Sequence, residues 1–303
     1  MLPFMRVFVR FANKGLGMEI DEKIRATSGM GNWSGFLQSG VTVENVLEAA
    51  KGWEKAILGV DKPWLCWNIN PDWAIVQQRL VESVGWVPVV GYDPRVGPPP
   101  LTKNAILVDF NKGLDFPVMY PHFPLEFAFA FAPRLAFWHS DLLLRVEKMA
   151  QYSEMFELLQ DGELSATQES TGLFQRLDKQ KLRYWELLGC VTRGASKSNF
   201  ENGCGWWLNF SKHPSCTDID EQAIRSKYHW ECGVGIRYWA KKYKQKVKII
   251  PEDNINEGHF TRINNQSYVS SSPNDWRRDV SKDLVNNFEL LAACRSLKLE
   301  HLL

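Results

Sequence analysis

The chain has 303 residues, which is long enough for one large domain or two small ones with a sizeable core. Its 36 basic and 35 acidic residues nearly cancel, and this argues against nucleic acid or an anionic membrane as the main partner, because those interfaces need a concentrated positive field. No window approaches the roughly 20 apolar residues of a membrane span. We therefore expect a soluble protein, with a cytoplasmic location favoured.

Two residue types are informative. The 13 tryptophans are many for this length, and we expect most of them to fill the core, although indole rings also stack on sugars. None of the six cysteines forms a C-x-x-C pair, which argues against a zinc ribbon or a thioredoxin-like site. Four of them lie in one region with His213 and His229: Cys190, Cys204, Cys216 and Cys232. Scattered buried thiols are the favoured interpretation over a metal cluster.

The first half of the chain alternates short apolar strands with periodic helices. The predicted strands cover residues 5–12, 63–68, 86–92 and 105–110, and the predicted helices cover 43–58 and 71–84. Asn70 is placed to cap the second helix, with Pro71 in its first turn. Repeated strand–helix–strand passages predict an α/β domain with a mostly parallel central sheet and helices on both faces.

Residues 128–144, AFAFAPRLAFWHSDLLL, are the centre of this pattern. The apolar run ends abruptly at His139-Ser140-Asp141, and a helical pattern from Asp141 to about residue 160 follows. Ligands of open α/β sheets bind at the carboxyl ends of strands, so Asp141 is a candidate to hold a metal or a substrate hydroxyl. Its ordinary alternative is to cap the helix. Asp109, at the end of the strand predicted over 105–110, is a rival carboxylate.

The second half is less regular. Residues 184–215 lack clean periodicity and contain several glycines and two adjacent tryptophans, so we interpret them as a functional loop region or as an irregular connection. Strands are predicted at 164–167 and 246–250, and helices at 220–228, 236–243 and 280–297. Residues 1–262 would form the catalytic domain, and residues 263–303 a loop and helix that pack on the same domain.

The order of these features resembles the GT-A class of nucleotide-sugar glycosyltransferases. In that class an Asp-x-Asp motif ends a central strand, a glycine-bearing loop and an acidic residue before a helix shape the acceptor side, and a C-terminal His can complete a metal site. His139-Ser140-Asp141 matches the motif in part, since its first residue is His. The resemblance covers roughly residues 5–260 and rests on short motifs.

The resemblance implies a Rossmann-related GT-A fold and a transferase that moves a sugar from a nucleotide-diphosphate donor to a hydroxyl of a saccharide or glycoconjugate acceptor. It implies Asp141 and His259 as ligands of Mn²⁺ or Mg²⁺, with imidazole favouring Mn²⁺, and Glu231 as the base. The residues expected to contact donor or acceptor are His139, Ser140, Arg193, Gly203, Gly205, Trp206 and Trp207. We expect Asp141, His259 and Glu231 to converge, and residues 203–207 to border the same pocket.

Each assignment has an ordinary structural alternative. His139 would bond the backbone at the strand end, Arg193 would pair with a surface carboxylate, and Glu231 would be a helix-start charge. Trp206 and Trp207 would pack in the core. The competing function is a non-catalytic carbohydrate-binding or scaffold protein with a degraded metal motif. A third hypothesis is a hydrolase that uses Asp141 and Glu231 as a carboxylate pair.

Overall fold

The computed structural model describes residues 41, 43–116, 119–168, 184–206, 218–225, 233–259 and 287–303. The strand predicted over 5–12, Trp207 and Glu231 lie outside these ranges. Among the helices within them, none combines the length and the apolar character needed to cross a membrane.

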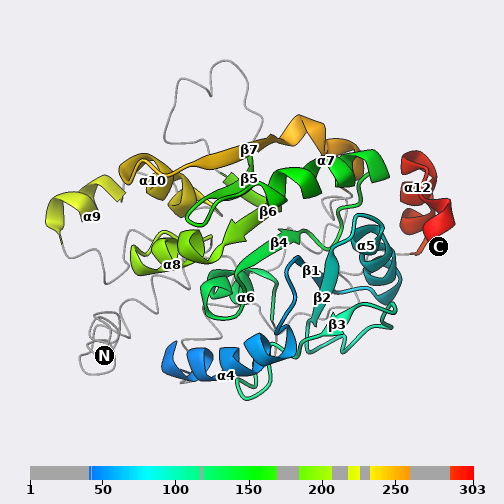
Figure 1. Ribbon diagram of the computed structural model, residues 1–303, viewed down its shortest axis with the longest axis horizontal. Coiled ribbons are helices and arrows are strands. Elements are labelled where there is room, and N and C mark those ends of the chain that lie inside the picture. The colour runs from blue at the N-terminus through cyan, green and yellow to red at the C-terminus, as the bar shows by residue number, and fades with distance from the viewer. Residues whose placement is uncertain are drawn as a thin grey trace, which may run out of the picture.

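A seven-stranded sheet forms the middle of the molecule, in the order β3-β2-β1-β4-β6-β5-β7 (Figure 1). Its strands are β1 (Pro63–Asn68), β2 (Val87–Tyr92), β3 (Ile106–Leu107), β4 (Arg134–Trp138), β5 (Leu164–Gln168), β6 (Tyr184–Thr192) and β7 (Val247–Pro251). Strand β4 is central, and among the described strands only β6 runs antiparallel to its neighbours. The predicted α/β fold with a mostly parallel sheet is thus confirmed.

Helices cover both faces of the sheet. They are α4 (Val43–Ala56), α5 (Pro71–Ser83), α6 (His122–Glu126), α7 (Val146–Glu157), α8 (Arg193–Glu201), α9 (Ile219–Arg225), α10 (Val234–Lys242) and α12 (Asn287–Leu297), with 3-10 turns η1 (Ala128–Ala130), η4 (Glu252–Asn254), η5 (Asn256–Gly258) and η8 (Glu300–Leu302). Buried side chains of α5, α7 and α12 pack with Trp138 in one core cluster, and those of α4, α8 and α10 pack with Phe137 in another. Because neighbouring residues of a strand point to opposite faces, β4 contributes to both.

Helix α5 shows how local chemistry positions the site. Asn70 accepts hydrogen bonds at Oδ1 from the backbone N–H of Asp72 and Trp73, as predicted for its cap, and Pro71 opens the first turn. The buried face of this helix includes Gln77, which points to the end of β4. Helix α12 packs against α5, as Figure 1 shows at the right of the molecule.

Three sequence predictions are corrected by the structure. The apolar run from residue 128 to His139 is not one strand, because η1 occupies its first part and β4 starts only after Pro133. Helix α7 begins at Val146 with Arg145 at its N-cap position, so Asp141 does not cap it. The region predicted as a loop from 184 contains the nine-residue strand β6 and then α8. Burial of β6 on both faces removes the alternation that would have identified it.

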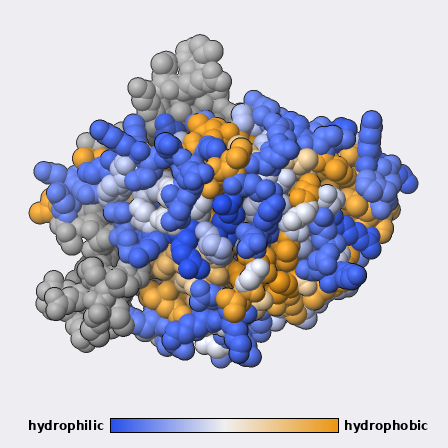
Figure 2. Space-filling view, in the orientation of Figure 1, coloured by the Kyte–Doolittle hydropathy of each residue, from blue (hydrophilic) through white to orange (hydrophobic). Residues whose placement is uncertain are grey.

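The aromatic residues mainly fill the core, as expected. Of the nine tryptophans within the described ranges, eight are buried: Trp53, Trp64, Trp67, Trp73, Trp86, Trp138, Trp206 and Trp239. The Trp64 ring lies 5.2 Å from that of Trp138 and 5.4 Å from that of Trp86, at the tilted or edge-on angles that aromatic pairs prefer. Outside this core, the face shown in Figure 2 is covered largely by hydrophilic residues with hydrophobic groups between them.

Candidate metal centre

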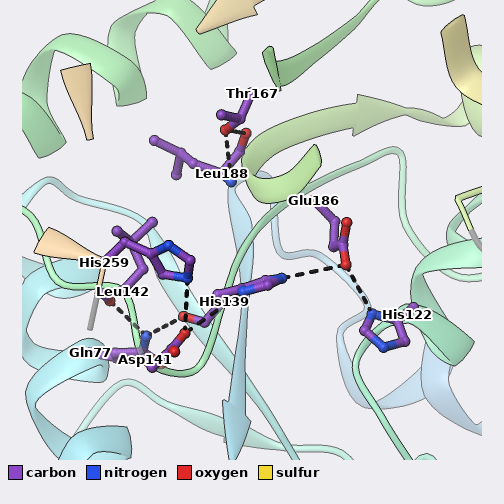
Figure 3. Close-up of polar contacts among 9 residues, drawn as sticks. All are labelled: Gln77, His122, His139, Asp141, Leu142, Thr167, Glu186, Leu188 and His259. Carbon is purple, nitrogen blue, oxygen red and sulfur yellow. Dashed lines mark hydrogen bonds and ion pairs between the residues drawn. The ribbon is translucent and has the colours of Figure 1, made fainter. Parts of the chain in front are cut away.

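Three side chains that could bind a metal meet at the end of the central strand. One ligand atom from each of His139, Asp141 and His259 lies within 4.8 Å of the others. Asp141 Oδ1 lies 3.5 Å from His259 Nε2 and 3.7 Å from His139 Nδ1 (Figure 3). The structure thus brings together Asp141 and His259, which are distant in sequence, and adds His139 to them.

A close backbone approach places His259 beside Asp141. Leu142 forms an antiparallel bridge with His259, and the Leu143 N–H donates to the Gly258 carbonyl at 2.9 Å. A Cβ atom on Gly258 would lie 1.7 Å from the Leu143 oxygen, which no side chain tolerates. The residue before His259 must therefore be glycine for the two segments to meet.

Gln77 fixes the other side of the turn. This side chain of α5 is buried, and its Nε2 donates to the carbonyl oxygens of His139 at 2.8 Å and of Leu142 at 2.9 Å. One amide therefore holds both ends of the segment that carries Asp141. The same amide satisfies one buried and one partly buried carbonyl, which makes the turn a rigid support for the cluster.

Glu186 and His122 extend the cluster into the protein. Glu186 Oε1 lies 3.4 Å from His139 Nε2 and 3.5 Å from His122 Nδ1, and both new side chains are buried. Burial lowers the pKa of His122 to about 4, an effect that the negative charge of Glu186 partly opposes. The sequence analysis missed Glu186. Its signal was a single carboxylate within the apolar strand YWELLGCVT, since charged residues are rarely buried without partners.

A bulge in β6 places the Glu186 side chain beside His139 and His122. The ladder with β5 pairs Ala166 with Gly189 and then Thr167 with Trp185, so it skips the residues between Trp185 and Gly189. Thr167 Oγ1 takes the place of the missing ladder bonds, because it accepts from the Leu188 N–H at 3.1 Å and donates to the Leu188 carbonyl at 3.0 Å. Bulges commonly redirect side chains next to functional sites.

The donor set fits a divalent cation. Two ligand atoms at about 2.1 Å from one ion are about 3.0 Å apart at a right angle and about 3.4 Å apart at the tetrahedral angle. The observed separations of 3.5 Å and 3.7 Å are only slightly wider. With neutral imidazoles, Asp141 and Glu186 give the cluster two negative charges in a largely buried position, and a cation would balance them.

Arg193 is not brought to the cluster. In the pairing of β4 with β6, Arg134 faces Thr192 while Trp138 faces Leu188, so Arg193 lies at the opposite end of β4 from His139. Its guanidinium donates to the Ala132 carbonyl and pairs with Glu54 at 3.4 Å. Arg193 thus forms the ion pair with a surface carboxylate that was its structural alternative, and it lies too far from Asp141 to contact a diphosphate there.

The glycine loop lies at the same edge of the sheet as the end of β4, but the side chain of Trp206 points into the core. The Trp206 carbonyl accepts from the Gly233 N–H, and Gly233 packs on the Tyr184 carbonyl at the start of β6. The Trp206 ring is 3% exposed and lies 5.3 Å from the Phe137 ring, so it fills the core and offers no platform for a sugar.

The remaining candidates are placed as follows. Gly203 and Gly205 flank the buried Cys204, and a Cβ on Gly205 would lie 2.1 Å from a carboxylate oxygen of Glu126. Ser140 is partly exposed between His139 and Asp141. The rival carboxylate Asp109 accepts from the Asn111 N–H in a turn and is not part of the metal-type cluster. Glu231 and Trp207 have no described position.

Comparison with known proteins finds no family model, no curated protein and no solved structure that matches this chain.

Proposed function

We propose that this protein is a metal-dependent glycosyltransferase of the GT-A class, which moves a sugar from a nucleotide-diphosphate donor to an acceptor hydroxyl. The approach of His259 to Asp141 at the end of central strand β4 is the observation that carries the proposal. These positions correspond to the strand-end motif and the C-terminal His of the resemblance described above. The mostly parallel sheet with helices on both faces is compatible with that class.

Each member of the cluster has a chemical role in this proposal. His139 Nδ1, a carboxylate oxygen of Asp141 and His259 Nε2 would hold the cation, which would offset the negative charge of a diphosphate leaving group. Of Mn²⁺ and Mg²⁺, two imidazole ligands favour Mn²⁺, because Mg²⁺ prefers oxygen ligands and water. Glu231 keeps its proposed role as the base that accepts the proton of the acceptor hydroxyl.

Calorimetry with a panel of nucleotide-diphosphate sugars, with and without Mn²⁺, tests the proposal. We expect at least one donor to bind in a Mn²⁺-dependent way, and Asp141→Asn to lose this binding while it keeps the fold. Asp61→Asn is the matched control, since this exposed carboxylate precedes β1 at the opposite edge of the sheet. Equal Mn²⁺-dependent binding by Asp141→Asn and the parent would remove the main support for the proposal.

The donor set also supports a second candidate, a metal-dependent hydrolase. Two imidazoles and one carboxylate form catalytic zinc sites, in which the cation activates water. Tight Zn²⁺ binding without binding of any nucleotide sugar would favour this candidate. Sugar binding without any cation would instead favour the non-catalytic carbohydrate-binding alternative.

A further inference from the structure

Glu186 is a buried carboxylate with an imidazole on each side. Its side chain is 6% exposed, and its Oε1 lies 3.4 Å from His139 Nε2 and 3.5 Å from His122 Nδ1. Figure 3 shows both rings directed toward the same oxygen of this carboxylate, from different elements of the chain. An ionised carboxylate is costly to bury unless polar groups of opposite or donor character face it, and the two ring nitrogens face this one at ion-pair distances, without the geometry of a hydrogen bond.

Because Nε2 lies closer to Glu186 than Nδ1 lies to Asp141, the arrangement favours one tautomer of His139. A neutral imidazole carries a proton on one nitrogen and a lone pair on the other. If Nε2–H faces Glu186, the lone pair is on Nδ1, and Nδ1 is the atom that lies 3.7 Å from Asp141. A carboxylate that holds the distal N–H of a histidine is the usual outer partner of a metal-binding imidazole, since it fixes the ring and raises its basicity.

We propose that Glu186 is a positioning residue of the metal centre, which holds His139 in the Nε2–H tautomer so that Nδ1 presents its lone pair to a divalent cation. This inference rests on the cation-binding part of the proposed function. It requires no contact between Glu186 and the donor or the acceptor.

The fold holds Glu186 in this place from two directions. The β6 bulge interrupts the ladder with β5 at this residue, while the His139 N–H donates to the Leu187 carbonyl at 3.0 Å and so ties the bulge to the end of β4. On its far side, Glu186 meets His122, whose ring stacks on Tyr120 at 5.8 Å. Both neighbours of the carboxylate are therefore fixed before any ligand binds.

Nitrogen-15 NMR of the histidine side chains in the metal-free full chain tests the tautomer. The signals of His139 are assigned by their loss in His139→Asn. We expect the Nε2–H tautomer in the parent and a shift toward the Nδ1–H tautomer in Glu186→Gln. Glu163→Gln is the matched control, because Glu163 is a partly buried glutamate at the start of β5, at the opposite edge of the sheet. An Nδ1–H tautomer in the parent would overturn the proposal, whether or not any variant folds.

Titration of the same proteins with Mn²⁺ measures the consequence. We expect the Kd of Glu186→Gln to rise by about 10- to 100-fold over the parent, and that of Glu163→Gln to be unchanged. If the parent binds Mn²⁺ and Glu186→Gln shows the same Kd and the same tautomer, this inference fails while the metal centre stands. If the parent binds no cation, the metal centre and the inference fail together.

Discussion

Gly258→Ala is the substitution that most directly tests how the cluster is built. The added Cβ would lie 1.7 Å from the Leu143 oxygen, whereas Cβ contacts under 3.0 Å essentially never occur. The two segments must therefore separate by about 1.3 Å or more. That movement breaks the 2.9 Å bond from the Leu143 N–H to the Gly258 carbonyl and draws His259 away from Asp141.

The expected loss of stability follows from that bond. A lost backbone hydrogen bond costs about 1 kcal/mol, and a buried N–H left without a partner adds about 1–3 kcal/mol. We expect the free energy of unfolding, measured by denaturant titration, to fall by roughly 2–4 kcal/mol. The Kd for Mn²⁺ should rise at least tenfold, since one imidazole ligand is displaced, which corresponds to about 1.4 kcal/mol or more.

Gly52→Ala is the matched control, because Gly52 lies within α4 and a Cβ there would meet nothing within 4 Å. Alanine should stabilise that helix by up to about 1 kcal/mol and leave the Kd for Mn²⁺ unchanged. If Gly258→Ala kept both the stability and the Mn²⁺ affinity of the parent, the close approach would not be what holds His259 in place.

Two further predictions concern groups around the cluster. Since burial lowers the pKa of His122 from 6.5 to about 4, the unfolded chain binds more protons between these values, and stability should fall as the pH falls. From pH 7 to pH 5 the parent should lose about 2 kcal/mol more unfolding free energy than His122→Gln, and equal losses would contradict burial in the neutral form. Gln77→Leu and Gln78→Leu each remove a buried amide that makes backbone hydrogen bonds, and each should cost about 1–3 kcal/mol. Only Gln77→Leu should also weaken Mn²⁺ binding, so equal Mn²⁺ affinities of the two variants would refute the supporting role of Gln77.

Elements with a local signal were predicted well. Strand β1 and helix α5 begin where expected, because an apolar run and an Asn-Pro helix start are properties of a few neighbouring residues. Strand β6 was missed, since it is buried on both faces and its bulge disturbs the period of two. The β4 run was predicted too long for a related reason: an apolar segment alone does not distinguish a strand from the buried turns that precede it.

The candidate site was predictable in so far as topology determines it. Asp141 and His259 each follow an apolar strand, and strands of a parallel sheet present their carboxyl ends on one edge, so their approach followed from the predicted fold. Arg193 was misplaced because it follows a strand that runs antiparallel, which puts it at the other edge. The direction of β6 depends on distant pairings that no local pattern expresses.

The contacts that complete the cluster are departures from regular structure. The β6 bulge leaves Glu186 outside the ladder with β5, and the bridge at His259 is possible only because Gly258 has no side chain. Regular pairing at either place would have kept more backbone hydrogen bonds within the sheet. Such departures persist where the surrounding structure fixes them, and they concentrate at functional sites. Within the part of the chain that the structure describes, both departures lead to the same group of side chains, which is why we place the function at this end of β4.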